Sequence, residues 1–271
     1  MKILKKIMKF ILKLFKWSLI LGFILALVRF LAGTIYSAGV IKQTPKITEE
    51  MITKATGGTT NMYDSTGQVI YSDTEHRRDY IRYDEIPNKY IELLLATENK
   101  NYWNEKGWSF EAVLAAIKSK GARGGSTIEQ QLIKNLVFSS DVKDRTIDRK
   151  IKEIWLASQM DLNFDKKQIL EWYINLINMG EGSYGANTIA ITYYGQSLKD
   201  LTGDDATTLS KLATIAGLGQ APSSYNLYDN PELVEERRNI VLLSAYNNNK
   251  ITEEQYEEAK KVPIQDGLKE R

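Results

Sequence analysis

A short polar segment, residues 122–135, brings together residue types that suit an anionic, oxygen-rich ligand. Gly124 and Gly125 allow a tight turn, and Ser126 followed by Glu129 fits a capping box, which predicts a helix with Ser126 as its N-cap. The free N–H groups at such a helix start attract anions. The side chains predicted to bind are Ser126, Thr127, Gln130, Gln131, Lys134 and Asn135. The segment suits a phosphorylated sugar; the alternative is an ordinary capped surface helix.

A second segment, residues 145–158, carries cations at helical spacing. Arg145, Arg149 and Lys152 gather on one side of the predicted helix, with Glu153 at the edge of this basic stripe. The opposite, apolar face is predicted to contain Ile147, Ile151, Ile154 and Ser158. The stripe is either a phosphate-binding surface beside a carboxylate or a solvated face with an Arg149–Glu153 pair.

A third candidate, Glu98, ends the apolar run of residues 93–98 (LLLATE). A carboxylate at the end of an apolar helix can have a raised pKa and can act as a general acid or base. The alternative is a glutamate that faces solvent.

Composition excludes several other chemistries. The 271 residues include no cysteine and one histidine, His76, which excludes disulfides and thiolate nucleophiles and argues against a zinc site. The net charge is +2, but residues 1–41 contain seven basic side chains and no acidic ones, which leaves the remaining chain at −5. A net acidic main domain argues against nucleic-acid binding.

The N-terminus has the pattern of a membrane anchor. Residues 1–16 form a basic segment with six lysines, and residues 17–41 form an apolar stretch interrupted by Arg29, long enough to span a bilayer. The excess of lysine before the span predicts a cytoplasmic N-terminus and an extracellular main domain at the cell membrane. The alternatives are a cleaved signal peptide or a buried helix.

The rest of the chain divides by its patterning. Residues 42–80 are predicted to be a polar linker with a short hairpin at 61–73 around an Asp-Ser-Thr-Gly turn. Residues 81–262 have mostly helical patterning, with a glycine-rich break at 180–188, and residues 263–271 are predicted to be a tail. The main domain is therefore predicted to be mainly α.

Five segments, in this order, resemble the motifs of the glycosyltransferase domain of bacterial peptidoglycan polymerases. They are ENKNY (98–102), GGSTIEQQLIKN (124–135), RKIKE (149–153), ILEWYIN (169–175) and RRNIVL (237–242). The second motif is highly specific. Three positions depart from the family pattern, because Asn99 stands in place of Asp, Glu105 in place of His, and Ala115 in place of Arg.

The resemblance implies a lysozyme-like fold with two lobes, head and jaw, above an N-terminal transmembrane helix. It implies polymerisation of lipid II onto a growing lipid-linked glycan, with inversion and release of undecaprenyl pyrophosphate. Because the chain ends soon after the motifs, we expect a monofunctional enzyme without a transpeptidase domain. The expected partners are lipid II, the lipid-linked glycan, the membrane and other cell-wall synthesis proteins.

The resemblance also implies roles for the candidate residues. Glu98 and Glu153 are the expected catalytic carboxylates, with Glu98 as the base and Glu153 holding the basic groups or binding a divalent cation. No organic cofactor is expected, and the cation with the pyrophosphate is Mg²⁺ or Mn²⁺. The pyrophosphate-binding cations are expected to be Lys134, Arg145, Arg149 and Lys152. Two alternatives stay open, a lysozyme-like peptidoglycan hydrolase and a catalytically weak scaffold that binds precursor.

Overall fold

The structure is a computed structural model of the chain, and it describes residues 2–57, 61–72, 77–111, 126–138 and 146–271. Its α-helices are α1 (Lys2–Lys42), α2 (Glu49–Ala55), α3 (Asn88–Glu98), α5 (Ile128–Val137), α6 (Ile147–Asn163), α7 (Lys166–Leu176), α8 (Ala186–Tyr194), α9 (Ala206–Leu218), α10 (Pro231–Asn247) and α11 (Glu253–Lys261). Its strands are β1 (Asn61–Tyr63), β2 (Val69–Ser72), β3 (Arg77–Arg78), β4 (Asn178–Gly180) and β5 (Ser183–Tyr184). Two 3-10 turns are η1 (Tyr83–Glu85) and η3 (Leu198–Asp200).

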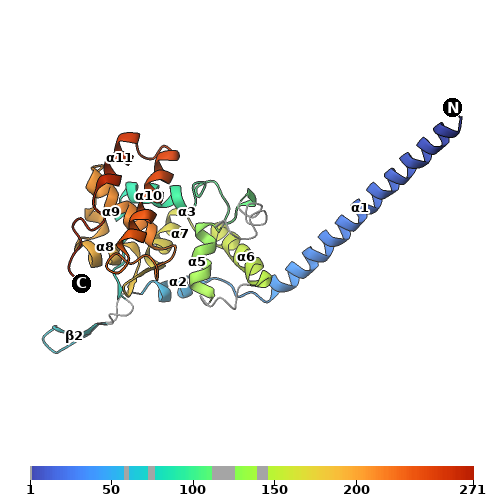
Figure 1. Ribbon diagram of the computed structural model, residues 1–271. Helices are drawn as coiled ribbons and strands as arrows, with labels where there is room; N and C mark the ends of the chain where they lie inside the picture. The colour runs from blue at the N-terminus through green and yellow to red at the C-terminus, as the bar shows by residue number, and fades with distance from the viewer. Residues whose placement is uncertain (1, 58–60, 73–76, 112–125, 139–145) are drawn as a thin grey trace.

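Helix α1 projects from the rest of the molecule as a long rod (Figure 1). Its stretch from Lys5 to Lys42 is long and apolar enough to cross a membrane, judged by length and composition, and the protein buries none of its most apolar part. The C-terminal end of α1 packs on α6, where the Tyr36 hydroxyl donates a hydrogen bond to Asp148. The predicted span of residues 17–41 lies within this helix.

The body of the molecule is mainly helical, which confirms the predicted fold class. Helix α10 packs on α9, α3 and α11, whereas α5 packs on α6 and α7. Figure 1 shows α8, α9, α10 and α11 gathered at one side of the body, with α5 and α6 between this group and α1. The apolar core runs through both groups, from Leu132 on α5 to Leu212 on α9.

Short polar side chains set where several of these helices begin. Thr146, Asp165, Asp205 and Thr252 precede α6, α7, α9 and α11, and each accepts a hydrogen bond from a backbone N–H of the first turn. Such caps satisfy donors that have no partner inside the helix. The starts of these helices, including α6, which carries the RKIKE motif, are therefore fixed by local sequence.

The predicted hairpin is confirmed. Strands β1 and β2 pair antiparallel across the turn that begins at Asp64. Its Oδ1 accepts hydrogen bonds from the backbone N–H groups of Thr66 and Gln68, at 2.8 and 2.9 Å. Gly67 completes the turn with a φ of 86°, a conformation that glycine adopts without steric cost.

Three segments contain more structure than the sequence pattern predicts. The linker includes helix α2, which forms because Thr48 caps it and Ile52 is buried. The glycine-rich break contains β5 and the last residue of β4, and β3 pairs with β5. The predicted tail packs on the body, where Ile264 and Leu268 contact the core. In each case a few apolar side chains or long-range backbone pairs order a polar segment.

Candidate active site

A cleft of about 650 Å³ brings together residues from four helices and two loops. Its lining includes Glu98 of α3, Ser126 before α5, Gln130, Gln131, Lys134 and Asn135 of α5, Glu153 of α6, Arg237 of α10, and loop residues near Asn178 and Gln220. The structure therefore places most of the predicted site residues around one cavity.

Glu98 is the last residue of α3 and has a hydrogen-bond donor at each carboxylate oxygen. Arg237 donates from Nη2 to Oε1 at 2.8 Å, and Gln131 donates from Nε2 to Oε2 at 3.2 Å. The side chains of Glu98 and Arg237 are only 16% and 8% exposed. The carboxylate orientation is thus fixed, while each oxygen keeps a lone pair that can accept a proton.

Tyr173 sets the orientation of Gln131. The Tyr173 hydroxyl donates to Oε1 of Gln131 at 3.0 Å, which leaves Nε2 of that amide directed at Glu98. Burial, with a further contribution from the negative charge of Glu98, raises the pKa of Tyr173 well above its ordinary value. The phenol therefore stays protonated and keeps donating.

The start of α5 differs from the prediction. Thr127, not Ser126, is the N-cap, and its Oγ1 accepts from the N–H of Gln130 at 3.3 Å. Glu129 is buried, and its Oε1 accepts from Nζ of Lys166 at 2.5 Å. The predicted Ser126–Glu129 capping box is wrong, because Glu129 pairs with a cation on α7 instead of its own helix start.

Lys150 connects α6 to the start of α5. Its Nζ lies 2.9 Å from Oγ of Ser126, 3.0 Å from Oε1 of Gln130 and 3.2 Å from Oε2 of Glu153. The other oxygen of Glu153 accepts from Nε of Arg149 at 2.9 Å. The Glu153 side chain is 7% exposed, so this carboxylate is largely buried between two cations.

The predicted apolar face of α6 is wrong. Ile147 is 76% exposed, whereas Glu153 and Met160 are buried and Arg149 is mostly covered. Residues 149, 153, 156 and 160 repeat at helical spacing and face the body. The apolar part of this face, Leu156 and Met160, lies in the core, and the charged part turns inward because Arg149 and Glu153 pair with each other and Lys150 links Glu153 to the start of α5.

The predicted basic stripe is divided between two places. Arg149 pairs with Glu153 beside the cleft, but Lys152 lines a separate pocket of about 330 Å³ with Tyr36 of α1 and Asp148. Arg145 lies outside the described residues. Lys152 therefore faces the end of the apolar helix, away from the residues that line the cleft.

Sequence reasoning missed two cations at the site: Arg237, which lines the cleft, and Lys150, which contacts residues that line it. Both lie in recognised motifs, RRNIVL and RKIKE. Each motif contains several neighbouring cations, and the sequence does not indicate which of them reaches the cleft. Arg238 shows the difficulty: it is fully buried and donates to Oγ of Ser210 and to the carbonyl of Val262. Of the two adjacent arginines, one serves the cleft and the other holds α10 in place.

The cleft carboxylates do not form a metal site by themselves. Both oxygens of Glu153, the expected ligand, accept hydrogen bonds from cations. Within the residues that the structure describes, no group of three or more His, Asp or Glu side chains could hold a metal ion. The predicted Mg²⁺ or Mn²⁺ stays a prediction.

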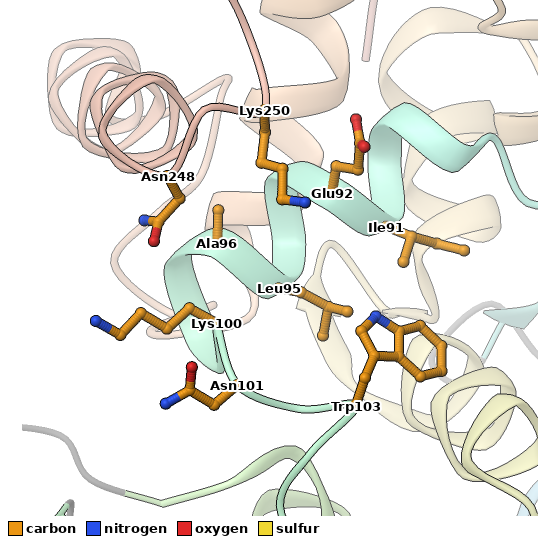
Figure 2. Close-up of a pocket in the computed structure, with 9 residues that line it drawn as sticks. All are labelled: Ile91, Glu92, Leu95, Ala96, Lys100, Asn101, Trp103, Asn248 and Lys250. Carbon is orange, nitrogen blue, oxygen red and sulfur yellow. The ribbon is translucent and has the colours of Figure 1, made fainter.

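A separate pocket of about 310 Å³ lies beside α3 and the turn after α10 (Figure 2). Ile91, Leu95 and Trp103 form its apolar part. Its polar side chains are Glu92, Lys100, Asn101, Asn248 and Lys250, none of them a predicted site residue. It shares no residue with the cleft. The cleft contains most of the predicted site residues and is therefore the candidate active site.

Comparison with known proteins shows the family of the chain. Residues 65–246 match the family model described as transglycosylase. The chain is 36% identical to penicillin-binding protein 1A of Streptococcus oralis over 84% of this chain and 35% of that protein. It is 39% identical to penicillin-binding protein 1A of Aquifex aeolicus over 75% of this chain and 27% of that protein.

A further relative, penicillin-binding protein 1A/1B of Bacillus subtilis, is 33% identical over 93% of this chain and 27% of that protein. A crystal structure of penicillin-binding protein 1A from Haemophilus influenzae matches at 28% identity and a TM-score of 0.44, over 76% of this chain and 21% of that one. The chain thus spans about a third or less of the length of these relatives. The family model covers more than half of the chain, which shows that it belongs to the transglycosylase family, the glycosyltransferases of peptidoglycan synthesis.

Proposed function

We propose that this chain polymerises lipid II into glycan strands, with inversion at the donor and release of undecaprenyl pyrophosphate. One observation carries the proposal: the cleft holds an oriented carboxylate, Glu98, and a separate group of cations and amides around Glu153. Glycosyl transfer to a hydroxyl needs a base, and a departing pyrophosphate needs positive charge. The residues of the cleft supply both.

In the proposed reaction, Glu98 is the general base. The 4-hydroxyl of lipid II loses its proton to the Glu98 carboxylate as its oxygen attacks the anomeric carbon of the lipid-linked strand. The new carbon–oxygen bond forms as the bond to the pyrophosphate oxygen breaks, and the electron pair leaves with undecaprenyl pyrophosphate. Attack on the face opposite the leaving group inverts the anomeric configuration. Arg237 and Gln131 hold the base in place for this step.

The leaving group is assigned to the other part of the cleft. Lys150, Arg149 and Lys134 are the cations that would stabilise the pyrophosphate, beside the N-terminal end of α5. Gln130 adds a candidate donor, because its buried Nε2 has no hydrogen-bond partner among the described residues. Glu153 holds Arg149 and Lys150 in position.

The remaining residues predicted to bind substrate differ in where they lie. Ser126 and Asn135 line the cleft and would orient the sugars and phosphates. Thr127 is buried and donates to the carbonyl of Gly107, so it supports the start of α5. Lys152 is left out of the pyrophosphate site because it lines the pocket at α1. Arg145 stays a predicted ligand.

We also propose that α1 anchors the chain in the cell membrane, with the N-terminus in the cytoplasm and the body outside. The basic residues before the apolar stretch support this orientation. The chain has no cysteine, so Glu270→Cys and Lys5→Cys would each introduce a unique thiol. In intact cells an impermeant thiol reagent should label the first variant and not the second. Labelling of Lys5→Cys alone would reverse the topology.

Labelled lipid II tests the proposed reaction directly. The full chain in detergent or vesicles should convert it to glycan polymer, seen as a ladder on a gel. Cleavage of preformed glycan without polymer would favour the hydrolase alternative. Binding of lipid II without turnover would favour the scaffold alternative.

A further inference from the structure

Two of the positions that depart from the family pattern, Asn99 and Glu105, contact each other. Nδ2 of Asn99 donates to Oε2 of Glu105 at 2.6 Å. The other side of the same amide, Oδ1 of Asn99, accepts from the backbone N–H of Ile128 at 3.1 Å. Asn99 directly follows Glu98, and Ile128 is the first residue of α5. One amide therefore links the candidate base to the helix that carries Gln130, Gln131 and Lys134.

The loop that contains this pair is held at a second point. The carbonyl of Gly107 accepts from Oγ1 of Thr127 at 2.8 Å, next to the Ile128 contact. Gly107 has a φ of 78°, and a Cβ at this position would lie 2.3 Å from the backbone oxygen of Ala157 on α6. Figure 2 shows the chain leaving the end of α3 and turning through Asn101 toward Trp103. The loop of residues 99–107 thus contacts α3, α5 and α6.

We propose that Asn99 and Glu105 form a positioning pair, which fixes the Glu98 carboxylate relative to the start of α5. This inference rests on the proposed function for its catalytic consequence. Neither side chain lines the cleft, so both act through the residues they hold. The carboxylate of Glu105 accepts from Nδ2 and thereby keeps Oδ1 of Asn99 directed at Ile128.

The chemistry of the pair predicts that its two members depend on each other. An amide both donates and accepts, whereas an ionised carboxylate only accepts. Asn99→Asp would keep an acceptor for the Ile128 N–H but would place a second carboxylate against Glu105. Two ionised carboxylates at this distance repel each other, and a proton shared between them at lower pH relieves the repulsion.

A cycle of nearly isosteric variants tests the pair. Glu105→Gln keeps an oxygen that accepts from Asn99, so its turnover should stay within about twofold of the parent. Asn99→Asp should lower kcat about ten- to hundredfold at about pH 8 with a small change in KM, because misplacement of a reacting group can cost about 10²-fold. In the double variant N99D/E105Q the amide at position 105 can donate to the carboxylate at position 99. The hydrogen bond forms again in the opposite direction, so most of the lost kcat should be recovered.

The pH profile separates positioning from general damage. In Asn99→Asp a shared proton can replace the lost N–H donor, so its kcat relative to the parent should be highest near pH 5.5 and fall as the pH rises. The kcat of N99D/E105Q relative to the parent should not depend on pH. Parent-like turnover of Asn99→Asp at about pH 8, or a double variant as slow as Asn99→Asp, would overturn the proposal.

Thermal unfolding of the full chain in detergent tests the contact between Asn99 and Glu105 without lipid II. The Tm of Asn99→Asp should fall relative to the parent as the pH rises, and N99D/E105Q should remove this difference. If the parent makes no glycan polymer but these Tm shifts occur, the proposed function fails and the pair stands as a structural contact. If Asn99→Asp does not fold, Glu105→Ala takes its place, with a several-fold loss of kcat expected and parent-like turnover contradicting the proposal.

Discussion

The two glutamates of the cleft have different surroundings. Glu98 has one cation, Arg237, and one neutral donor, Gln131. Glu153 has two cations, Arg149 and Lys150, one at each oxygen. Both oxygens of Glu153 are therefore occupied by charged donors, whereas Glu98 faces a cation at one oxygen only. The contrast supports the proposal that Glu98 is the base and that Glu153 holds the cations.

A third buried glutamate extends the comparison. Glu129 has a single cation, Lys166, and Lys166 also pairs with Asp161 at 2.6 Å. Burial raises the pKa of Glu129 above its ordinary value even though Lys166 acts to lower it. Glu153 thus has two cations, Glu98 has one, and Glu129 shares its single cation with Asp161, so each environment predicts a different behaviour.

The largest effect is expected for Glu98→Gln. Glutamine keeps the size and one oxygen that can accept from Arg237, but it cannot accept the proton, so polymerisation of lipid II should fall about 10²- to 10⁴-fold. Lipid II binding and the Tm should stay close to the parent values. Glu153→Gln should keep more activity, because it weakens the cation cluster and leaves the base. A normal rate for Glu98→Gln with an inactive Glu153→Gln would reverse the assignment.

Lys150→Ala tests the cation end of the cleft, with Lys152→Ala as its matched control. Loss of Lys150 removes contacts to Ser126, Gln130 and Glu153, and charge-assisted contacts of this kind predict a loss of affinity for a lipid-linked pyrophosphate of about ten- to hundredfold. Lys152 lines the pocket at α1, so its removal should change this affinity less than about twofold. Direct binding of undecaprenyl pyrophosphate measures both. Equal losses would show that helix charge, not position, matters.

Tyr173→Phe tests whether Gln131 helps to orient the Glu98 carboxylate. The variant removes the donor that fixes the Gln131 amide, so the amide can turn and present its oxygen to Glu98. We expect kcat to fall about three- to tenfold, since one neutral hydrogen bond contributes about 1 kcal/mol. Steady-state kinetics at several pH values measure the change. An unchanged kcat would mean that Arg237 alone orients the base.

The smallest effect concerns stability and pH at Glu129. Because its pKa is higher in the folded chain than in the unfolded chain, the folded state holds the proton more tightly. Stability should therefore fall as the pH rises from the ordinary carboxyl range through the raised pKa. Glu129→Gln has no proton to lose, so its Tm should show a weaker fall over this window. Parallel pH curves for the two proteins would contradict this account.

Sequence patterning alone predicted the fold class, the motifs and seven of the fifteen residues that line the cleft. Apolar spacing along the chain predicted a mainly α domain, because the 3.6-residue period depends on neighbours in sequence. The hairpin at Asp64 and Gly67 was predictable for the same reason, since its turn is stabilised by its own side chain and backbone. The motif residues Glu98, Gln131 and Glu153 were chosen from short segments, and the structure places them around one cavity.

Only the tertiary structure decided which neighbouring residues face the cleft. Arg237 rather than Arg238 lines the cleft, and Lys150 rather than Lys152 contacts the lining residues Ser126 and Gln130, because of partners far away in sequence. Arg237 reaches Glu98 across 139 positions, and no local pattern records that contact. The polar inner face of α6 was missed for the same physical reason: buried charges are stable only where their partners are, and the fold places those partners.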